Sequence, residues 1–480
     1  MVNVNNKYII GVDGGSQSSK VVIFDLEGNV VSEGKQPLRP MVLRDPGIVE
    51  HPDDDLWDSI AAAGREAMSR FPGSPEEIIG LGLCTIRFCR VLLKADGTLA
   101  APVMSWMDAR VSRPYVHEND DVKYVTTTTG YFTHRLTGQF RDTAANYQGQ
   151  WPIDTDTWQW SEDEAFFNSC NIPREMLFEL QMPGTILGRV TEEAARLTGF
   201  PAGIPVVATA NDKAVEALGA GLLQGNTALV SLGTYIAAMV NGRDNPKDAQ
   251  RFWVNFASVP GGYLYESNGI RRGMWTVSWL QQLLGDEIGL KAKALGISPE
   301  EYMNREAAKV PAGSNGLMTV MNWLAPANEP FKKGMMIGFD GRHTSAHMYR
   351  SILEAIALTI KNHADAMTSE LGIRLERLVL SGGGSNSGLI MQIFADVFGI
   401  PASRNVVTGS ASLGSAICAA VALGVYADYD TAISRMVKVR DTFEPIPEHT
   451  ALYTRMNEEV YRQLTGCTDA VLRKSYELFG

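Results

Sequence analysis

The sequence predicts an α/β protein made of two related domains, and three observations lead to this prediction. Strand-like and helix-like segments alternate along the chain, with no low-complexity linker between them. The 480 residues are too many for one hydrophobic core, and 45% of them are hydrophobic, enough to fill more than one. An apolar run, a glycine-containing turn and a second apolar run occur together twice, about 220 residues apart. This spacing indicates an internal duplication.

The first hundred residues predict strands interrupted by one helix. Strands are expected at 8–13, 20–28, 29–34, 78–86 and 90–97. A helix is expected at 53–71, because acidic residues fill its first turn and apolar residues such as Leu56 and Ile60 recur at helical spacing.

The rest of the chain continues the alternation. Strands are expected at 203–212 and 227–242, helices at 273–285 and 346–367, and a strand, glycine turn and helix at 375–401. The repeated hairpin pattern is "YIIGVDGGSQSSKVVIFDLEG" from residue 8 and "ALVSLGTYIAAMVNG" from residue 228. A polar, turn-rich stretch, "NGRDNPKDAQ", follows the second copy. We therefore expect domains at 1–242 and 243–480.

Composition excludes several classes of partner. A net charge of −11 without any basic tract disfavours nucleic acid and anionic membranes. No run of eighteen apolar residues suggests a membrane span, and the N-terminal stretch lacks the pattern of an export signal, so we expect a cytoplasmic protein. Five cysteines without a CxxC pair favour reduced thiols over a disulfide framework or a zinc site.

The first glycine turn carries a charge that needs an explanation. Backbone N–H groups at such a turn can hold anionic oxygens, and glycines let a polyphosphate approach closely. Asp13 before the turn could anchor a hydrated Mg²⁺, while Lys20 after it could balance phosphate charge. The alternative is that Asp-Gly-Gly serves turn geometry alone. The turn "SGGGSNS" at 381–387 leaves a similar choice between packing and binding of adenosine or phosphate at the following helix.

Together these segments resemble the FGGY carbohydrate kinases, which belong to the actin, Hsp70 and hexokinase superfamily. The resemblance covers nearly the whole chain: "GVDGGSQSSK" and "VSLGTY" resemble the two phosphate motifs, and "LVLSGGGSNSGLIMQIFADVFGIP" the adenosine motif. "GMMIGFDGRHTSAHMYRSILEAIA" resembles the C-terminal signature, departing from it at Phe339. Among relatives the chain looks most like bacterial sugar kinases of unassigned substrate. The resemblance implies two duplicated RNase H-like domains with an interdomain cleft, sugar mainly on the first and nucleotide mainly on the second.

The resemblance also implies site residues, with ATP and Mg²⁺ as the bound groups. Asp13 matches the magnesium-associated aspartate of the family. The residues that match nucleotide-binding positions are Gly14, Ser16 and Lys20 in the first loop, Gly233 and Thr234 in the second, and Gly273, Gly383 and Gly384 around the nucleotide.

Asp212 is the candidate catalytic base. It follows a predicted strand and resembles the family's base, and a carboxylate can accept the proton of a sugar hydroxyl during phosphoryl transfer. The alternative is a helix cap or a first-turn carboxylate, since Asp is favoured at both positions. Lys213 beside it could contact a substrate hydroxyl.

Arg87, Trp106 and Asp108 resemble sugar-contacting positions. The arginine and the carboxylate can hydrogen-bond hydroxyls, and the indole can pack against a carbon chain. The alternatives are that Trp106 is a core residue and that Arg87 and Asp108 pair with each other. Phe88 stands where glycerol kinases carry a glutamate, which disfavours glycerol. The segment 113–142 is short for the family, which leaves substrate contacts there in doubt.

The sequence therefore predicts an ATP-dependent sugar kinase that phosphorylates a short sugar or polyol, with a ketopentose or pentitol favoured, such as xylulose or ribulose. Two alternatives stay open: a nucleotide-gated binding or chaperone-like ATPase on the same fold, and an inactive sugar-sensing homologue. A homodimer contact through the amphipathic segment at 451–464 is a further open possibility.

Overall fold

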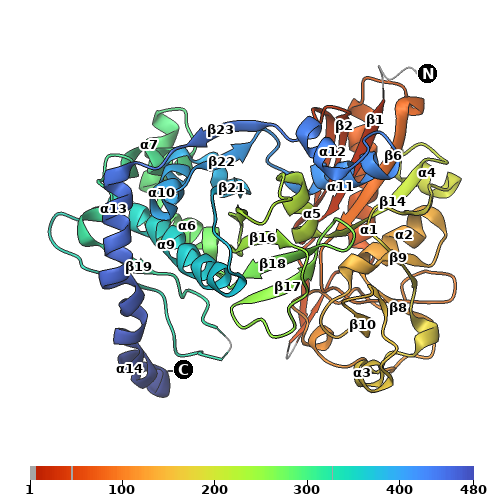
Figure 1. Cartoon of the computed structure of the whole chain (residues 1–480), viewed down its shortest axis with the longest axis horizontal. Coiled ribbons are helices and arrows are strands. Elements are labelled where there is room, and N and C mark those ends of the chain that lie inside the picture. The colour runs from red at the N-terminus through yellow and green to blue at the C-terminus, as the bar shows by residue number, and fades with distance from the viewer. Residues whose placement is uncertain (1–6, 45–46, 327, 480) are drawn as a thin grey trace.

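The computed structural model describes residues 7–44, 47–326 and 328–479, and it shows two lobes side by side (Figure 1). Each lobe is organised around one mixed sheet. The chain forms the first sheet and its helices, crosses once to the second lobe, and later returns two helices to the first. This is the predicted α/β class with two related domains.

The first sheet has six strands in the order β13-β14-β6-β1-β2-β3. Strands β1, β6 and β14 are parallel, whereas β2 and β3 continue antiparallel from β1. The bounds are β1 (Tyr8–Gly14), β2 (Ser18–Asp25), β3 (Val30–Pro37), β6 (Ile78–Thr85), β13 (Ile186–Arg189) and β14 (Pro205–Asn211). Helices α1 (Asp55–Arg70) and α2 (Thr128–Thr137) cover one face, where Leu56 and Phe132 pack on the inward residues of β1 and β2.

The second sheet repeats this core in the order β17-β18-β16-β15-β21-β22-β23. Here β15, β21 and β22 are the parallel strands, so β18-β16-β15-β21-β22 corresponds to β3-β2-β1-β6-β14. The bounds are β15 (Thr227–Ser231), β16 (Ala238–Gly242), β17 (Phe252–Phe256), β18 (Tyr263–Ser267), β21 (Arg377–Ser381), β22 (Ala402–Asn405) and β23 (Val439–Phe443). Helices α9 (Ser345–Leu371) and α10 (Gly388–Phe398) cover one face. The predicted duplication is thus present in the sheets.

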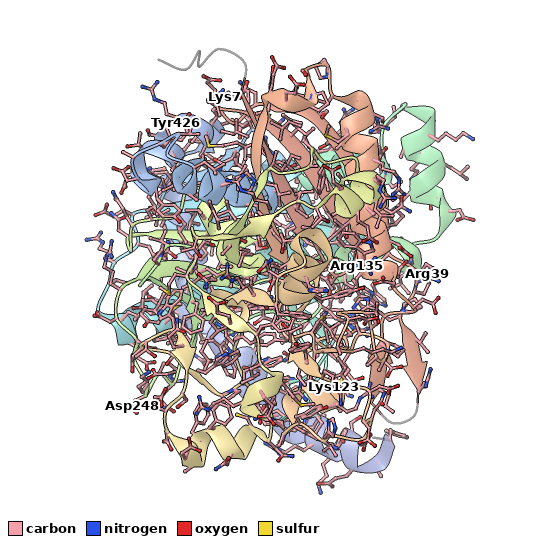
Figure 2. The ribbon with its side chains drawn as sticks, turned by 90° about the vertical axis from the view of Figure 1, so that its right-hand side faces the viewer. Lys7, Arg39, Lys123, Arg135, Asp248 and Tyr426 are labelled. Carbon is pink, nitrogen blue, oxygen red and sulfur yellow. The ribbon has the colours of Figure 1, made fainter. Side chains whose placement is uncertain are left out.

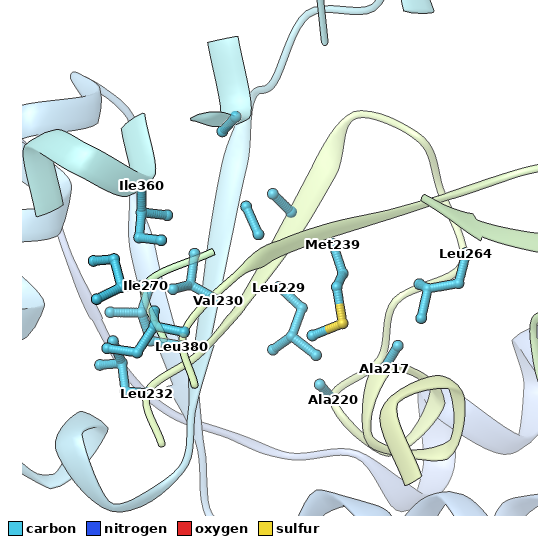
Figure 3. Close-up of a cluster of buried hydrophobic side chains, with 14 of the residues drawn as sticks. Ala217, Ala220, Leu229, Val230, Leu232, Met239, Leu264, Ile270, Ile360 and Leu380 are labelled. Carbon is cyan, nitrogen blue, oxygen red and sulfur yellow. The ribbon is translucent and has the colours of Figure 1, made fainter. Parts of the chain in front are cut away.

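The helix that follows the last parallel strand of each sheet packs against the other sheet. Helix α5 (Asp212–Gly219) follows β14 but lays Ala217 and its neighbour Ala220 on Leu229, Met239 and Leu264 of the second sheet (Figure 3). Helix α11 (Ser410–Ala422) follows β22 but packs on the open face of the first sheet, against Ile9 and Phe24.

Glycines permit this crossed packing. A Cβ at Gly219 of α5 would lie 1.8 Å from the carbonyl oxygen of Ser410, and one at Gly414 of α11 would lie 2.0 Å from that of Val215. A Cβ at Gly11 of β1 would lie 1.9 Å from the carbonyl oxygen of Ser412. No side chain fits at these distances, so the close approach of α5, α11 and β1 requires glycine.

The sheets correct the predicted domain boundary. A division at 242/243 would separate β15 and β16 from the five other strands of the second sheet, with which they are hydrogen-bonded. The division lies instead between α5 and β15, because the apolar run at 227–242 pairs with β21 and β18 and not with the first sheet.

Most predicted elements are confirmed, with two differences in extent. The expected strand at 90–97 shortens to β7 (Val91–Leu93), and the closing amphipathic helix runs further, as α13 (Pro447–Met456), a π-helical turn (Asn457–Tyr461) and α14 (Arg462–Phe479). The remaining helices are α3 (Glu164–Cys170), α4 (Glu192–Thr198), α6 (Gly273–Leu283), α7 (Asp286–Ala294), α8 (Pro299–Ala307) and α12 (Tyr429–Met436). The remaining strands form two-stranded ribbons: β4 (Val42–Arg44), β5 (Ile48–Glu50), β8 (Tyr124–Thr126), β9 (Arg141–Thr143), β10 (Ile153–Asp154), β11 (Gln159–Trp160), β12 (Glu179–Gln181), β19 (Met318–Val320) and β20 (Met335–Ile337).

Polar contacts fasten the returning helices and the first lobe. With that lobe turned to the viewer, Tyr426 lies at the same end of the molecule as Lys7 (Figure 2), and its hydroxyl donates to the carbonyl of Leu26. Arg39 and Arg135 flank the start of α1, where they pair with Asp55 and Asp54. Among the described residues, we find no helix with the length and apolar character that a membrane span requires.

Candidate active site

The carboxyl ends of the three parallel strands of the first sheet bring the predicted catalytic residues to one edge. In the strand register Asp13 is opposite Cys84, and both Gly14 and Asn211 are opposite Thr85. Asp13 is the second-to-last residue of β1, Arg87 follows β6, and Asp212 follows β14. Adjacent strands are about 4.8 Å apart, so these three positions lie within a few strand spacings of one another.

Asp212 is the first residue of α5 but not its cap. The side chain of Asn211 caps the helix by accepting from the backbone N–H groups of Lys213 and Ala214, both at 3.1 Å. Asp212 Oδ1 accepts one further bond, from the N–H of Lys213 at 3.0 Å. Because Asn211 already caps the helix, the capping alternative for Asp212 is wrong. The alternative of a first-turn carboxylate is confirmed, since Asp212 is the first residue of α5, and this position is compatible with a role as base.

The pKa of Asp212 is raised. Burial is the main cause and the charge of Glu216 adds to it, while Arg87 and Lys213 act in the opposite direction. A carboxylate with a raised pKa is a better proton acceptor than an ordinary aspartate, provided that it is ionised.

Asp13 lies in the same charge cluster. Burial, together with the charges of Asp212 and Glu216, raises its pKa to about 7, and Lys20 and Lys213 limit the increase. No hydrogen bond among the described residues uses its carboxylate oxygens. The described residues contain no group of three potential ligands that would enclose a metal ion. One free carboxylate in a negatively charged cluster fits Mg²⁺, which takes one or two carboxylates and completes its shell with water and phosphate oxygens.

Two polar contacts join α5 to the second sheet. Lys213 Nζ lies 3.0 Å from both Glu216 Oε2 and Ser231 Oγ, and Ser381 Oγ donates to Glu216 Oε1 at 2.5 Å. Ser231 and Ser381 end β15 and β21 and pair with each other in register. The ammonium of Lys213 is thus held at the junction with the second lobe, and its predicted contact with a substrate hydroxyl stays a prediction.

The predicted loops of the second lobe come together just beyond these serines. The N–H groups of Gly273 and Met274 donate to the carbonyls of Thr234 (2.7 Å) and Gly233 (3.1 Å), and that of Gly384 donates to the carbonyl of Leu232 (3.3 Å). A Cβ at Gly384 would lie 2.9 Å from Leu232 Cβ, so this glycine serves packing. A Cβ at the exposed Gly383 would meet nothing within 4 Å, so packing does not explain that glycine.

The first loop is tied down on one side. Gly14 packs against Ile60 and Phe132, where a Cβ would be 3.3 to 3.4 Å away, and Ser16 is partly exposed at the turn. Lys20 is opposite Asp13 in the hairpin and pairs with Glu33 at 2.8 Å. Lys20 is therefore shared between Glu33 and the charge cluster around Asp13.

Arg87 connects the two lobes. Its guanidinium donates to both carboxylate oxygens of Glu266 in β18, at 2.8 and 3.0 Å, and lies 3.4 Å from Asn255 Oδ1 in β17. The side chain of Arg87 is 16% exposed and that of Glu266 is 3% exposed. Burial acts to lower the pKa of Arg87, but Glu266 outweighs this effect and keeps it raised. Arg87 is thus a permanent positive charge beside Asp212.

Asp108 does not stand free for a substrate. Its Oδ1 accepts from the N–H and Nε of Arg110, and its Oδ2 accepts from the N–H of Val49 and from Nη2 of Arg110, all at 2.7 to 2.9 Å. The side chain is fully buried. The predicted sugar contact of Asp108 therefore finds no support in the geometry, and the alternative pairing of Arg87 with Asp108 is wrong because each has another partner.

Trp106 is accessible to solvent, and its predicted sugar contact stays a prediction. It is 48% exposed, so the alternative that it belongs to the core is wrong. Its segment pairs with the stretch after Arg87, since Arg90 and Met104 form a β-bridge.

Several functional residues could not be found by the motifs. Glu266, Glu216 and Asn255 hold the predicted residues in place, yet Glu266 lies 179 residues from Arg87 in sequence. The one available signal was a carboxylate inside the apolar strand "YLYES", which needs a buried partner. Phe88, with φ of 65°, holds a strained backbone next to Arg87, which no motif predicted.

Comparison with known proteins agrees with this geometry. Residues 8–118 and 115–219 match the N-terminal domain of the FGGY family of carbohydrate kinases, and residues 228–423 match its C-terminal domain. The chain belongs to the FGGY family of carbohydrate kinases. It is thus a sugar kinase, a phosphotransferase with two actin- and hexokinase-like domains. Membership of this family favours the kinase over the chaperone-like alternative. The two matches end and begin on either side of the division between α5 and β15.

Its FGGY relatives differ in what their names state. An uncharacterized sugar kinase of Escherichia coli (strain K12), YgcE, is 57% identical over 475 residues, which cover 99% of this chain and 96% of that protein. An autoinducer-2 kinase of Escherichia coli (strain K12) is 27% identical over 520 residues, covering 98% and 96%. These FGGY relatives span nearly the whole chain.

Solved FGGY kinase structures share the fold. A xylulose kinase from Rhodospirillum rubrum superposes with a TM-score of 0.83 at 24% identity, covering 97% of this chain and 100% of that one. A gluconate kinase from Lactobacillus acidophilus gives 0.82 at 18% identity, covering 98% and 99%. At these identities the likeness concerns the fold, because FGGY kinases with different named substrates fit equally well.

Proposed function

We propose that this FGGY kinase transfers the γ-phosphoryl group of ATP to a hydroxyl of a short polyhydroxylated acceptor. A ketopentose or pentitol, such as xylulose or ribulose, is the leading candidate. The names of its relatives, which include xylulose, gluconate and autoinducer-2 kinases, are compatible with this class without selecting one member.

The observation that carries the proposal is the situation of Asp212. It is a partly buried carboxylate that does not cap its helix, and its pKa is raised. In the same helix, Lys213 and Glu216 form hydrogen bonds with the serines that end β15 and β21. A base at this place can accept the proton of an acceptor hydroxyl while the second-lobe loops hold the phosphate chain.

The nucleotide would lie against both lobes. Gly233, Thr234, Gly273 and Gly383 lie in adjacent loops of the second lobe, and Gly14 and Ser16 lie at the facing turn of the first. The N–H groups of Gly233 and Gly273 already donate to the carbonyls of Ser231 and Thr234, so these glycines would permit close approach of the phosphates and not donate to them. Asp13 would hold Mg²⁺, which neutralises charge on the phosphate oxygens. Lys20 adds a positive charge on the side of the first turn.

The acceptor would lie between Asp212 and Arg87. Arg87 keeps a fixed orientation because Glu266 binds both arms of its guanidinium, and Trp106 offers an exposed aromatic face. Phe88 follows Arg87 and cannot accept a hydrogen bond, which disfavours glycerol as the acceptor.

The proposal is tested with a panel of ketoses, pentitols and glycerol, each incubated with ATP and Mg²⁺ and followed by ADP release. Turnover of one sugar or polyol that disappears in Asp212→Asn supports the proposal. ATP hydrolysis that needs no acceptor and survives Asp212→Asn contradicts it. Binding of a panel member without any phosphoryl transfer would favour the inactive sugar-sensing homologue.

A further inference from the structure

An unpartnered tryptophan lies beside the Arg87–Glu266 pair. In the register of β17 and β18, Trp253 is directly opposite Glu266, and directly opposite residues of an antiparallel pair project to the same face. Asn255, two residues along β17, shares that face and contacts Arg87. Trp253 is nevertheless 65% exposed. An indole so exposed, on the face of the sheet that contacts Arg87, requires an explanation.

A large cavity opens at Trp253. It has a volume of about 980 Å³ and runs from Trp253 and Tyr235, past the loop after β18, to α9 and the start of α14. Small-molecule sites typically occupy about 300 to 1,000 Å³. Tyr235 links the cavity to the active site, because it directly follows Thr234 of the second loop. Burial and the charge of Glu266 raise the pKa of Tyr235, and the charge of Arg87 lowers it.

The cavity wall offers polar groups that the protein leaves unused. Asn268, Asn322 and Asn328 line it, and none of their side-chain amides forms a hydrogen bond within the described part of the chain. By contrast, Asn362 on the far wall exchanges two amide hydrogen bonds with Asn457. Free amides beside exposed aromatic rings suit a ligand with hydroxyl groups and an apolar C–H face.

We propose that the Trp253 end of this cavity is the second lobe's part of the acceptor site, and that it binds the end of a polyhydroxylated acceptor remote from the attacked hydroxyl. The inference rests on the proposed function and sharpens it. Glu266 would position Arg87 for the reacting end, and Trp253 would contact the other end. An acceptor of five or more carbons could reach both, whereas glycerol could not.

The experiment measures binding, so it does not depend on turnover. Dissociation constants of D-xylulose, ribitol, D-gluconate and glycerol are measured by calorimetry for the full chain without nucleotide. The variants are Trp253→Ala, Trp253→Phe and, as a matched control, Phe339→Ala, an aromatic residue 54% exposed outside the cavity. Steady-state kinetics follow for any probe that is phosphorylated.

We expect Trp253→Ala to weaken at least one five- or six-carbon probe tenfold or more, while Trp253→Phe restores most of the affinity and Phe339→Ala changes it less than twofold. For a probe that is turned over, KM rises with kcat nearly unchanged. Failure of every probe to bind wild-type protein, or equal affinity in Trp253→Ala, overturns the subsite. Weakened binding without phosphoryl transfer supports the subsite and contradicts the proposed kinase reaction, so the two failures are distinguishable.

Discussion

The two lobes share one scaffold but divide the chemistry unequally. Asp13 is the second-to-last residue of β1 and precedes the first glycine turn, and in the repeated motif Ser231, the last residue of β15, takes its place in the second lobe. The carboxylate of Asp13 forms no hydrogen bond with any residue that the structure describes, whereas Ser231 is hydrogen-bonded to Lys213. The crossed helices differ in the same way, since α5 begins with Asp212, Lys213 and Glu216, and α11 with uncharged residues.

This difference shows that the duplication explains the shared sheets and crossed helices but not the charged residues of the candidate active site. Both copies provide a glycine turn that can face phosphate, and both send a helix across to the other sheet. The first copy carries Asp13, Asp212 and Glu216. The second copy contacts the residues around them: Ser381 bonds to Glu216, Ser231 to Lys213, and Glu266 to Arg87. The contrast can be broken or sharpened by changing one copy at a time.

Removing the negative charge of Asp212 should have the largest effect, and the effect is on the reaction rate. Asp212→Asn is expected to lower kcat by a factor of about 10² to 10⁴, because the acceptor hydroxyl loses its proton acceptor. The helix should remain folded, since Asn211 caps it. ADP release with the acceptor measures the rate, and circular dichroism checks the fold. Asp286→Asn, at the first residue of α7, is the matched control and should leave the rate unchanged.

Breaking the contact between the lobes should come next. Glu266→Ala leaves Arg87 buried without its partner, which costs about 3–5 kcal/mol of unfolding free energy. Urea unfolding measures this change. The exposed pair Arg141–Glu179 lies within the first lobe, so Glu179→Ala should cost less than about 1 kcal/mol. Equal losses of unfolding free energy in the two variants would mean that the buried interlobe pair stabilises the protein no more than an exposed pair does.

Adding a methyl group where α5 and α11 cross should destabilise the protein, whereas the same change in the largely exposed helix α7 should stabilise it. Gly219→Ala forces a methyl group into the carbonyl of Ser410 and is expected to cost about 1–3 kcal/mol. Gly289→Ala in α7 meets no atom within 4 Å and should stabilise the chain by about 0.5–1 kcal/mol through helix propensity. Thermal unfolding of both variants checks the signs, and a stabilised Gly219→Ala would contradict the close crossing.

The remaining prediction concerns Asp13 and depends on pH. Its pKa is about 7 in the fold against an ordinary value of 3.8, so the folded state retains a proton that the unfolded chain releases. Its stabilising contribution is complete below pH 3.8 and is lost as the pH rises through 7. The asparagine in Asp13→Asn cannot ionise. The melting temperature of this variant, relative to that of the wild type, should therefore increase from pH 4 to pH 8 when both are measured without Mg²⁺. A difference that stays constant over this range would show that Asp13 is not the group responsible.

The sequence allowed most of the scaffold to be predicted, because apolar periodicity and glycine turns are local signals. Both hairpins, helix α9 and the strand-turn-helix around Gly383 follow from such patterns. The candidate base and the clustering of the second-lobe loops followed from motifs.

What could not be predicted depends on residues distant in sequence. The boundary at 242/243 was wrong because strand pairing with β21, not the polar stretch after β16, assigns β15 to its lobe. The sequence did not show that Lys213 bonds to Ser231, because this contact depends on how α5 meets the second sheet. It did not show that Asp108 pairs with Arg110 either, because this contact depends on how residues 105–110 fold back. Glu266 and Trp253 lay outside every motif.

The crossed helices also limit how this protein can be cut. Helix α11 covers the face of the first sheet formed by Ile9 and Phe24, so a fragment ending before β15 would expose that apolar surface to water and aggregate.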